Sequence, residues 1–214
     1  MNNTMIIAID GPSASGKGTL AKMLAQHFDF PCLNTGALYR AVAYDVVRSC
    51  LDPNDFDDKI DYFAENITQE DLENEELFSE NIGAVASIIA KNQMLRDALF
   101  KFQKDFVRRA QEEDGGVVIE GRDTTTVICP EADCKFFVKA DVEVRAQRRF
   151  DQLQKKGDDV AFEKILGQLK KRDDNDLNRK NSPLTMAKDA VIIDNGNLSI
   201  KEGFELALKS IKGI

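Results

Sequence analysis

The sequence contains few of the residues that hold zinc. It has one histidine and four cysteines, and no two cysteines form a Cys-x-x-Cys pair. Structural zinc sites draw four ligands mainly from these two residue types, usually with such paired spacing. We therefore expect no zinc site, and we interpret the cysteines as reduced packing residues of a cytoplasmic protein.

Long apolar runs and an excess of positive charge are also absent. No apolar stretch is long enough to span a bilayer, and no charged-then-apolar signal opens the chain. The net charge of -8 argues against general affinity for DNA, RNA or an anionic membrane. We expect a cytoplasmic monomer whose partners are small molecules. Any polyanion that it binds must meet locally gathered Arg and Lys side chains.

Internal repeats, low-complexity tracts and the strings D-x-x-G and N-K-x-D are missing as well. The last two strings are typical of GTPase switches, so their absence argues against that class. The length of 214 residues fits one domain. A hydrophobic share of 43% with 31% charged residues is the composition of a soluble globular protein.

Five short apolar segments indicate β-strands. The runs 6–9, 117–119, 136–138 and 191–193 are rich in β-branched or aromatic residues and are continuous rather than alternating, as in buried parallel strands. The segment 30–33 is a weaker candidate. Helical patterns lie between these runs. The sequence therefore predicts an α/β fold with a parallel sheet and helices on both of its faces.

The stretch MIIAIDGPSASGKGTLAKML, residues 5–24, has the arrangement of a P-loop. A strand, a glycine-rich turn and a helix start place several backbone N–H groups around one point, where the helix dipole adds positive potential. Gly11 and Gly16 allow the backbone to turn, and Lys17 neutralises the outer phosphates. A nucleotide's phosphates are the natural occupant.

The residue after Lys17 is Gly18, whereas the P-loop pattern has a hydroxyl there. The loop thus gives up one direct ligand to Mg²⁺. The ion tolerates this loss because it keeps several waters and is often held mainly by substrate phosphates. Thr19 still offers a hydroxyl, and Gly-Lys-Gly-Thr resembles the loop of nucleoside monophosphate kinases. That resemblance implies a second nucleotide that helps to hold the metal.

Two segments after predicted strands carry groups suited to a second anion. NTGALYRAV, residues 34–42, places Thr35 as a helix cap with Tyr39 and Arg40 in the opening turns. VVIEGRDTT, residues 117–125, ends a buried strand in polar groups, where functional residues of open α/β sheets collect. Standing alone, the first segment is explained equally well by a surface arginine and a structural tyrosine.

Two later segments place arginines at helical spacing. In VEVRAQRRF, one helix face is predicted to carry Arg145, Arg148 and Arg149. Three cations so close repel each other unless an anion lies there, although a solvated basic face is the alternative. In KRDDNDLNRKNSPL, one face is predicted to carry Arg172, Asp176 and Arg179. This face offers phosphate and ribose-hydroxyl contacts, and an ion-pair ladder is its alternative.

Together these residues resemble the bacterial cytidylate kinase family, the CMP/dCMP kinases among the P-loop nucleoside monophosphate kinases. The P-loop, NTGALYRAV, EGRD, the double Arg, RDDNDLNR, SPL and DAVIIDN...LSI occur in the family's order and cover most of the chain. The resemblance implies transfer of the γ-phosphoryl group of ATP to CMP or dCMP. It also implies Mg²⁺ held mainly by phosphates and water, with no direct protein ligand.

The fold implied by the resemblance is a three-layer P-loop kinase fold with a five-stranded parallel sheet. It forms a single domain, 1–214, with an acceptor-binding insertion at about 50–95 and a mobile lid at about 150–175. The alternatives are a P-loop kinase for another small acceptor, such as AMP, UMP or shikimate, and a non-catalytic ATP-binding module.

The resemblance further implies a role for each matching residue. The donor's phosphates would contact Gly11, Pro12, Ser13, Ala14, Ser15, Gly16, Lys17, Gly18 and Thr19. The acceptor would contact Thr35, Tyr39, Arg40, Ser87, Arg96, Arg122, Asp123, Arg172, Asp176 and Arg179. The residues expected to act on the transferring group are Lys17, Arg122, Arg148, Arg149, Arg172 and Arg179, with Arg148 and Arg149 on the lid.

The chemistry of the base fits these roles. Asp123, matched with Arg96 and Ser87 as the cytosine-reading set, can accept the N4 amino group of cytosine. Uracil would set a carbonyl oxygen against that carboxylate. We therefore expect CMP and dCMP to be much better acceptors than UMP.

Three positions depart from the family's pattern. The segment 50–81 is short and acidic, where the family usually has a larger, strand-rich insertion. Thr124 and Thr125 stand where Ile-Gly is common, and Thr125 would strain the loop if that glycine needs a positive φ. Asn34 replaces a more usual aspartate.

Overall fold

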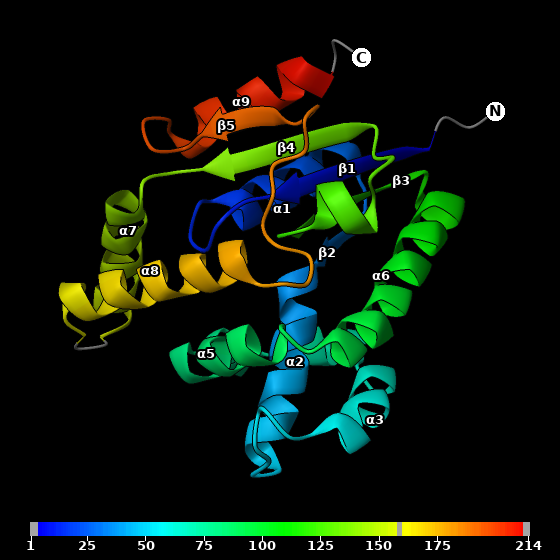
Figure 1. Cartoon of the computed structure of the whole chain (residues 1–214). Coiled ribbons are helices and arrows are strands. Elements are labelled where there is room, and N and C mark those ends of the chain that lie inside the picture. The colour runs from blue at the N-terminus through cyan, green and yellow to red at the C-terminus, as the bar shows by residue number, and fades with distance from the viewer. Residues whose placement is uncertain (1–3, 158–159, 212–214) are drawn as a thin grey trace.

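The computed structural model describes residues 4–157 and 160–211 (Figure 1). Its centre is a five-stranded sheet with the order β2-β3-β1-β4-β5, in which every pair is parallel. The strands are β1 (Met5–Asp10), β2 (Cys32–Asn34), β3 (Gly116–Gly121), β4 (Cys134–Lys139) and β5 (Val191–Asp194). All five predicted strands are confirmed, with shifts of at most two residues at their ends.

Helices cover both faces of the sheet, as the continuous apolar runs predict. Ile7 and Ile9 of β1 face α1 (Lys17–Phe28) and α9 (Ile200–Ile211). Ile6 and Ala8 point to the opposite face, which is covered by α2 (Thr35–Arg48) and α6 (Gln93–Asp114). Successive side chains of a strand alternate between faces, so a strand between two helical layers must be apolar at every position.

The prediction of a buried strand at 191–193 is wrong in one respect. β5 is the edge strand of the sheet, with β4 as its neighbour. Ile193 is fully buried, whereas Val191 and Ile192 are 37% and 45% exposed. An apolar run alone does not tell an edge strand from a central one, because the difference lies in what the rest of the chain covers.

The acidic insertion is helical rather than strand-rich. It contains the 3₁₀ turns η1 (Asp57–Lys59) and η2 (Glu75–Phe78) and the helices α3 (Ile60–Glu65), α4 (Gln69–Glu73) and α5 (Glu80–Ile89). Ile60, Phe63 and Leu77 are buried against α2 and α6, so the apolar residues of the segment are covered by the main core. In Figure 1 these helices lie around α2, away from the sheet.

The helices α7 (Val142–Lys156) and α8 (Phe162–Asn178) form a separate pair beside the sheet (Figure 1). A small core of Ala146, Ile165 and Leu169 joins them. The predicted lid at about 150–175 falls on this pair, and its residues 158–159 lie outside the described part. Within 4–157 and 160–211, no helix combines the length and hydropathy needed to cross a membrane.

Candidate functional site

The sequence-predicted site residues gather at one edge of the sheet. In a parallel sheet all strands end at the same edge, and ligands bind there in open α/β folds. The P-loop follows β1, Thr35 and Arg40 follow β2, and Arg122 and Asp123 follow β3. The helix that carries Arg148 follows β4. The fold therefore brings segments more than 100 residues apart to one place.

Glycines at two positions allow the P-loop to close. A Cβ at Gly11 would lie 2.1 Å from the backbone oxygen of Val138, so the loop can pass β4 only with glycine there. Gly16 has a φ of 93°, a left-handed conformation that side chains disfavour, and it precedes the first residue of α1. The backbone thus turns directly into a helix N-terminus, where N–H groups face a bound anion.

Lys17 lies in the loop with little access to water. Its side chain is about a tenth exposed, with Nζ 3.3 Å from the oxygen of Pro12 and 3.7 Å from a carboxylate oxygen of Glu120. Burial, and next the charge of Arg122, lower the pKa of Lys17 to about 7, although Glu120 opposes the shift. A bound phosphate would raise this pKa again and restore the charge, so the surroundings of Lys17 favour an anion.

The lowered pKa of Lys17 predicts that this residue makes the free energy of unfolding depend on pH. In the unfolded chain its pKa is near 10.5, so between pH 7 and 10.5 the unfolded state binds more protons and the folded state gains stability as pH rises. We expect the melting temperature of nucleotide-free wild type, minus that of Lys17→Met, to increase from pH 7 to pH 10. Lys22→Met, on the exposed side of α1, is the control. A difference that stays constant with pH would contradict the shift.

Glu120 lies close to the glycine at position 18. A Cβ at Gly18 would lie 3.1 Å from Oε1 of Glu120, closer than ordinary van der Waals contact. The carboxylate at the end of β3 therefore lies beside position 18, and a side chain there would have to displace it by a few tenths of an ångström. Sequence spacing could not show this, because the two residues are about 100 positions apart.

Four elements contribute arginines to a cluster beside the P-loop, and two of these arginines, Arg122 and Arg172, act on the charge of Lys17. Burial, followed by the charges of Arg172, Arg122 and Arg149, lowers the pKa of Arg40 to about 9. Burial and Arg122 lower the pKa of Arg172 to about 10. Burial is the larger cause of both shifts, and the remaining part shows that these cations lie close to one another. An anion carrying several charges is the group that such a cluster accepts.

One carboxylate lies within this cluster. Asp176 accepts a hydrogen bond from Nε of Arg122 at 2.7 Å and lies 3.8 Å from Nη1 of Arg179. Burial opposes its ionisation, but Arg122, Arg172 and Arg179 together outweigh burial and hold the pKa of Asp176 below its usual range. Nε of Arg172 and Nη2 of Arg179 are buried, and within the described residues neither has a hydrogen-bond partner. These two donors are free for a ligand's oxygens.

The predicted helical face of Arg172, Asp176 and Arg179 needs a correction. α8 ends at Asn178, and Arg179 is the first residue beyond it, with an extended backbone. Nε of Arg179 donates to the oxygen of Ser182 at 2.7 Å, which turns the side chain back. Asp176 pairs with Arg122, not with Arg172. The three residues still meet, but the turn after the helix brings Arg179 in.

The base-reading residues are partly assembled. Nη2 of Arg96 pairs with a carboxylate oxygen of Asp123, and the Arg96 guanidinium lies over the ring of Tyr39, 5.6 Å from its centre. Arg179 lies 4.0 Å from the other oxygen of Asp123. Ser87 bonds to a different residue, because its hydroxyl accepts a hydrogen bond from Nδ2 of Asn175 in α8 at 3.4 Å.

The prediction that Thr35 caps its helix is wrong. Asn34 is the N-cap, and its Oδ1 accepts from the N–H of Ala37 at 3.2 Å. Thr35 begins α2, and its hydroxyl donates to the oxygen of Glu120 at 3.0 Å. A Cβ at Gly121 would lie 2.3 Å from this hydroxyl, so Gly121 lets α2 approach the end of β3. Asn is as effective a cap as Asp, which accounts for that departure.

The three arginines of α7 do not share one anion. Arg145 is buried and makes two hydrogen bonds to the carboxylate of Asp173, at 2.5 and 3.1 Å, and one to the oxygen of Ser13 at 3.0 Å. It is therefore neutralised and ties the helix pair to the P-loop. Arg148 donates to the oxygen of Asn195 at 2.5 Å, and Arg149 to the oxygen of Phe78 at 3.5 Å.

Asn195 is a site residue that the sequence reasoning missed. Its Nδ2 donates to the oxygen of Ser15 at 2.9 Å, and a Cβ at Gly16 would meet it at 2.6 Å. It follows β5 directly, at the edge where the other site residues lie. That position was a usable signal, since the segment DAVIIDN was recognised as part of the family's pattern.

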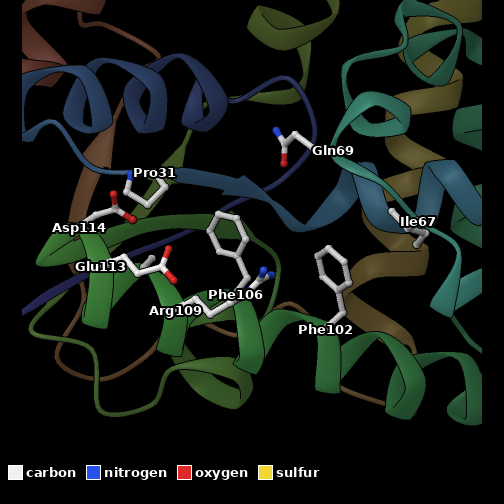
Figure 2. A pocket seen from close by; sticks show the side chains of 9 residues that line it. Pro31, Ile67, Gln69, Phe102, Phe106, Arg109, Glu113 and Asp114 are labelled. Atoms are coloured by element: carbon white, nitrogen blue, oxygen red, sulfur yellow. The ribbon is translucent and has the colours of Figure 1, made fainter.

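A surface hollow of about 350 Å³ lies elsewhere, between the start of β2 and α6. Figure 2 shows Phe102, Phe106 and Arg109 along one side of α6, with Glu113 and Asp114 further on. Its one cation faces two carboxylates, which is unfavourable for a phosphate. None of the predicted nucleotide-binding residues lines it.

Comparisons with known proteins agree with the geometry. Residues 7–213 match the family described as cytidylate kinase. The chain is 41% identical over 207 residues to the cytidylate kinase of Caulobacter sp. strain K31, covering 97% of this chain and 94% of the relative. It is 42% identical over 210 residues to that of Rhodopseudomonas palustris strain CGA009, covering 98% and 97%.

A solved structure supports the fold alone. The gluconokinase from Sinorhizobium meliloti superposes with a TM-score of 0.51 at 14% identity, over 99% of this chain and 93% of that one. The family match and the two relatives extend over almost the whole chain, including the P-loop and the arginine cluster that faces it. The chain therefore belongs to the cytidylate kinase family.

Proposed function

We propose that this protein transfers the γ-phosphoryl group of ATP to CMP or dCMP, giving ADP and CDP or dCDP. The observation that carries the proposal is the excess of buried positive charge between the P-loop and the acceptor residues. Lys17, Arg40 and Arg172 all have lowered pKa values there, and Nε of Arg172 has no partner within the described residues. Two nucleotides supply the negative charge that this site lacks.

The donor's phosphates lie on the P-loop, residues 11–19, in this proposal. Backbone N–H groups at the start of α1 bind them, and Lys17 contacts the outer phosphates. Two side chains from other elements hold the loop in place, since Asn195 bonds to Ser15 and Arg145 to Ser13. The loop is thus preorganised and needs little rearrangement on binding.

The acceptor lies across the edge of the sheet. Arg40 and Arg122 bind its phosphate, with Thr35 and Tyr39 beside them, and Asp176 with Arg172 contacts the ribose. Asp123, held by Arg96, accepts the N4 amino group of cytosine. Ser87 completes this set; its hydroxyl accepts from Asn175 and keeps its own O–H to donate.

Transfer in this site depends on position and charge rather than on a general base. The attacking group is a phosphate oxygen that is already anionic. Arg122, Arg172 and Arg179 neutralise the oxygens of the moving group, and one such arginine contributes roughly 10³-fold to the rate. Arg148 and Arg149 close over the donor, and the pair α7–α8 acts as the lid that excludes water.

The residues present fit a magnesium ion that is held by nucleotides. Position 18 carries no hydroxyl, so the phosphates of the two nucleotides and water would supply the ion's ligands. Mg²⁺ accepts such a site because it retains several waters. When bound, it neutralises the phosphate oxygens of the donor.

An acceptor panel tests the proposal. ATP and Mg²⁺ are incubated in turn with CMP, dCMP, UMP, AMP and shikimate, and the products are separated by chromatography. We expect stoichiometric ADP with CDP or dCDP, and UMP turnover up to roughly 10⁴-fold slower in kcat/KM. Conversion of another acceptor at the CMP rate would reject the base assignment. Failure with every acceptor would favour a non-catalytic ATP-binding module.

A further inference from the structure

Asp10 is a buried carboxylate with an unusual set of partners. It ends β1, directly before Gly11 of the P-loop, and it is fully buried. Within the described residues it forms no ion pair with a lysine or arginine. A buried charge without a counterion needs hydrogen bonds to each of its oxygens.

Two threonines provide all of these bonds. Oδ1 of Asp10 accepts from the N–H of Thr124 at 2.9 Å and from its hydroxyl at 2.8 Å. Oδ2 accepts from the N–H of Thr125 at 2.8 Å and from its hydroxyl at 2.6 Å. Each oxygen thus receives one backbone and one side-chain donor, and both threonines are buried. Hydrogen bonds to an ionised acceptor are the stronger kind.

This geometry resolves the expected strain at Thr125. Its backbone is not among the positive-φ residues of the described chain, so no glycine is required there. Residues 124–128 form a π-helical turn, with the oxygen of Asp123 accepting from Val127 at 2.9 Å and from Ile128 at 3.1 Å. Such turns are rare in proteins, and those that occur often lie at functional sites.

The hydrogen bonds from Thr124 and Thr125 to Asp10, here called the clamp, join the two halves of the site. Asp10 is continuous with the donor loop, and the threonines are continuous with Arg122 and Asp123 of the acceptor side. The donor loop has further anchors in Asn195 and Arg145. The side chains of Arg122 and Asp123 have anchors of their own in Asp176 and Arg96, so the bonds to Asp10 act on the backbone that joins these residues to the P-loop.

We infer that the hydroxyls of Thr124 and Thr125 are positioning groups for phosphoryl transfer. They bind Asp10 and so fix Arg122 and Asp123 relative to the P-loop, without touching either nucleotide. The inference rests on the acceptor roles proposed above for Arg122 and Asp123. A displacement of about 1 Å at reacting groups costs roughly 10²-fold in rate, so a bond that fixes their distance has a measurable kinetic effect.

Thr125→Val tests the clamp, because it keeps the shape of the side chain and removes the hydroxyl. We expect kcat/KM for CMP to fall roughly ten- to a hundred-fold, the KM for ATP to stay within about two-fold, and the preference for CMP over UMP to decrease. Thr125→Ser keeps the hydroxyl and should keep both kcat/KM for CMP and the preference for CMP over UMP near the wild-type values. The matched control is Thr126→Val, in the same turn, since no hydrogen bond involves the Thr126 side chain within the described residues.

Three outcomes would overturn the inference. One is a lower melting temperature with unchanged kinetic constants at 25 °C, which would show that the role is purely structural. The second is wild-type-like selectivity in Thr125→Val, and the third is a defect that Thr125→Ser does not repair. If Thr125→Val does not fold, Thr125→Gly, which keeps the backbone bond, replaces it. Wild-type protein that fails to convert CMP would refute the proposed function itself, so the two failures are distinguishable.

Discussion

Lys17→Met is expected to lower kcat for CMP phosphorylation by about 10³-fold or more while leaving the fold intact. Removing one group that stabilises transition-state charge costs on this order. The fold should survive because Lys17 is buried with a pKa of about 7, so its charge adds little to the stability of the folded protein in the absence of nucleotide. Methionine fills a similar volume, and Arg122 remains near Glu120. Steady-state kinetics with coupled ADP detection provides the measurement.

Controls separate a catalytic loss from a folding loss. Lys22→Met changes the charge by the same amount on the same helix but on its exposed side, and it should retain wild-type kinetics. Circular dichroism and melting temperature should be close to wild type for both variants. Turnover near the wild-type rate in a folded Lys17→Met protein would show that the P-loop assignment is wrong.

Asp123→Asn should have the second-largest effect, on the choice of base. The wild-type carboxylate favours the amino group of cytosine and repels the O4 carbonyl of uracil, and such a site discriminates by up to roughly 10⁴-fold. The asparagine side chain presents both a donor and an acceptor. We therefore expect kcat/KM for CMP to fall and that for UMP to change little or rise. The ratio of the two constants is the quantity to measure.

The substitution also leaves Arg96 without its charged partner. A buried cation that loses its counterion costs roughly 3–5 kcal/mol of stability, so melting temperatures accompany the kinetics. Asp97→Asn is the matched control, because this exposed neighbour of Arg96 bonds to Gln93 and not to the site. An Asp123→Asn protein that is folded and keeps the wild-type preference for CMP would reject the role of Asp123.

Short-range patterns predicted much of the fold. The strand positions, the helices on both faces and the P-loop follow from periodicity, glycine placement and the alternation of strands with helices. The edge position of β5 was not predictable, since Val191 and Ile192 are apolar in the same way as residues of central strands. Their exposure depends on which elements the chain leaves beside them.

The candidate site was predictable as a set of residue types but not as a set of contacts. Helical spacing correctly put Arg145 and Arg148 on the same helix. It could not show that Asp173 from another helix pairs with Arg145 and not with Arg148. The cap at Asn34 was missed because Asn and Thr are both good caps, and the neighbouring Thr35 was chosen. Spacing within one element says which residues share a face, and it does not say which partners face them.

The sequence by itself determined the phosphate-binding loop, the parallel sheet and the family's ordered set of polar residues, because each depends on groups close together along the chain. Only the tertiary structure decided how those groups are paired. Glu120 fills the space beside Gly18, Asp176 selects Arg122, and Thr124 and Thr125 bind Asp10. The physical reason is that these pairs join residues 54 to 115 positions apart, at distances fixed by how the strands and helices pack.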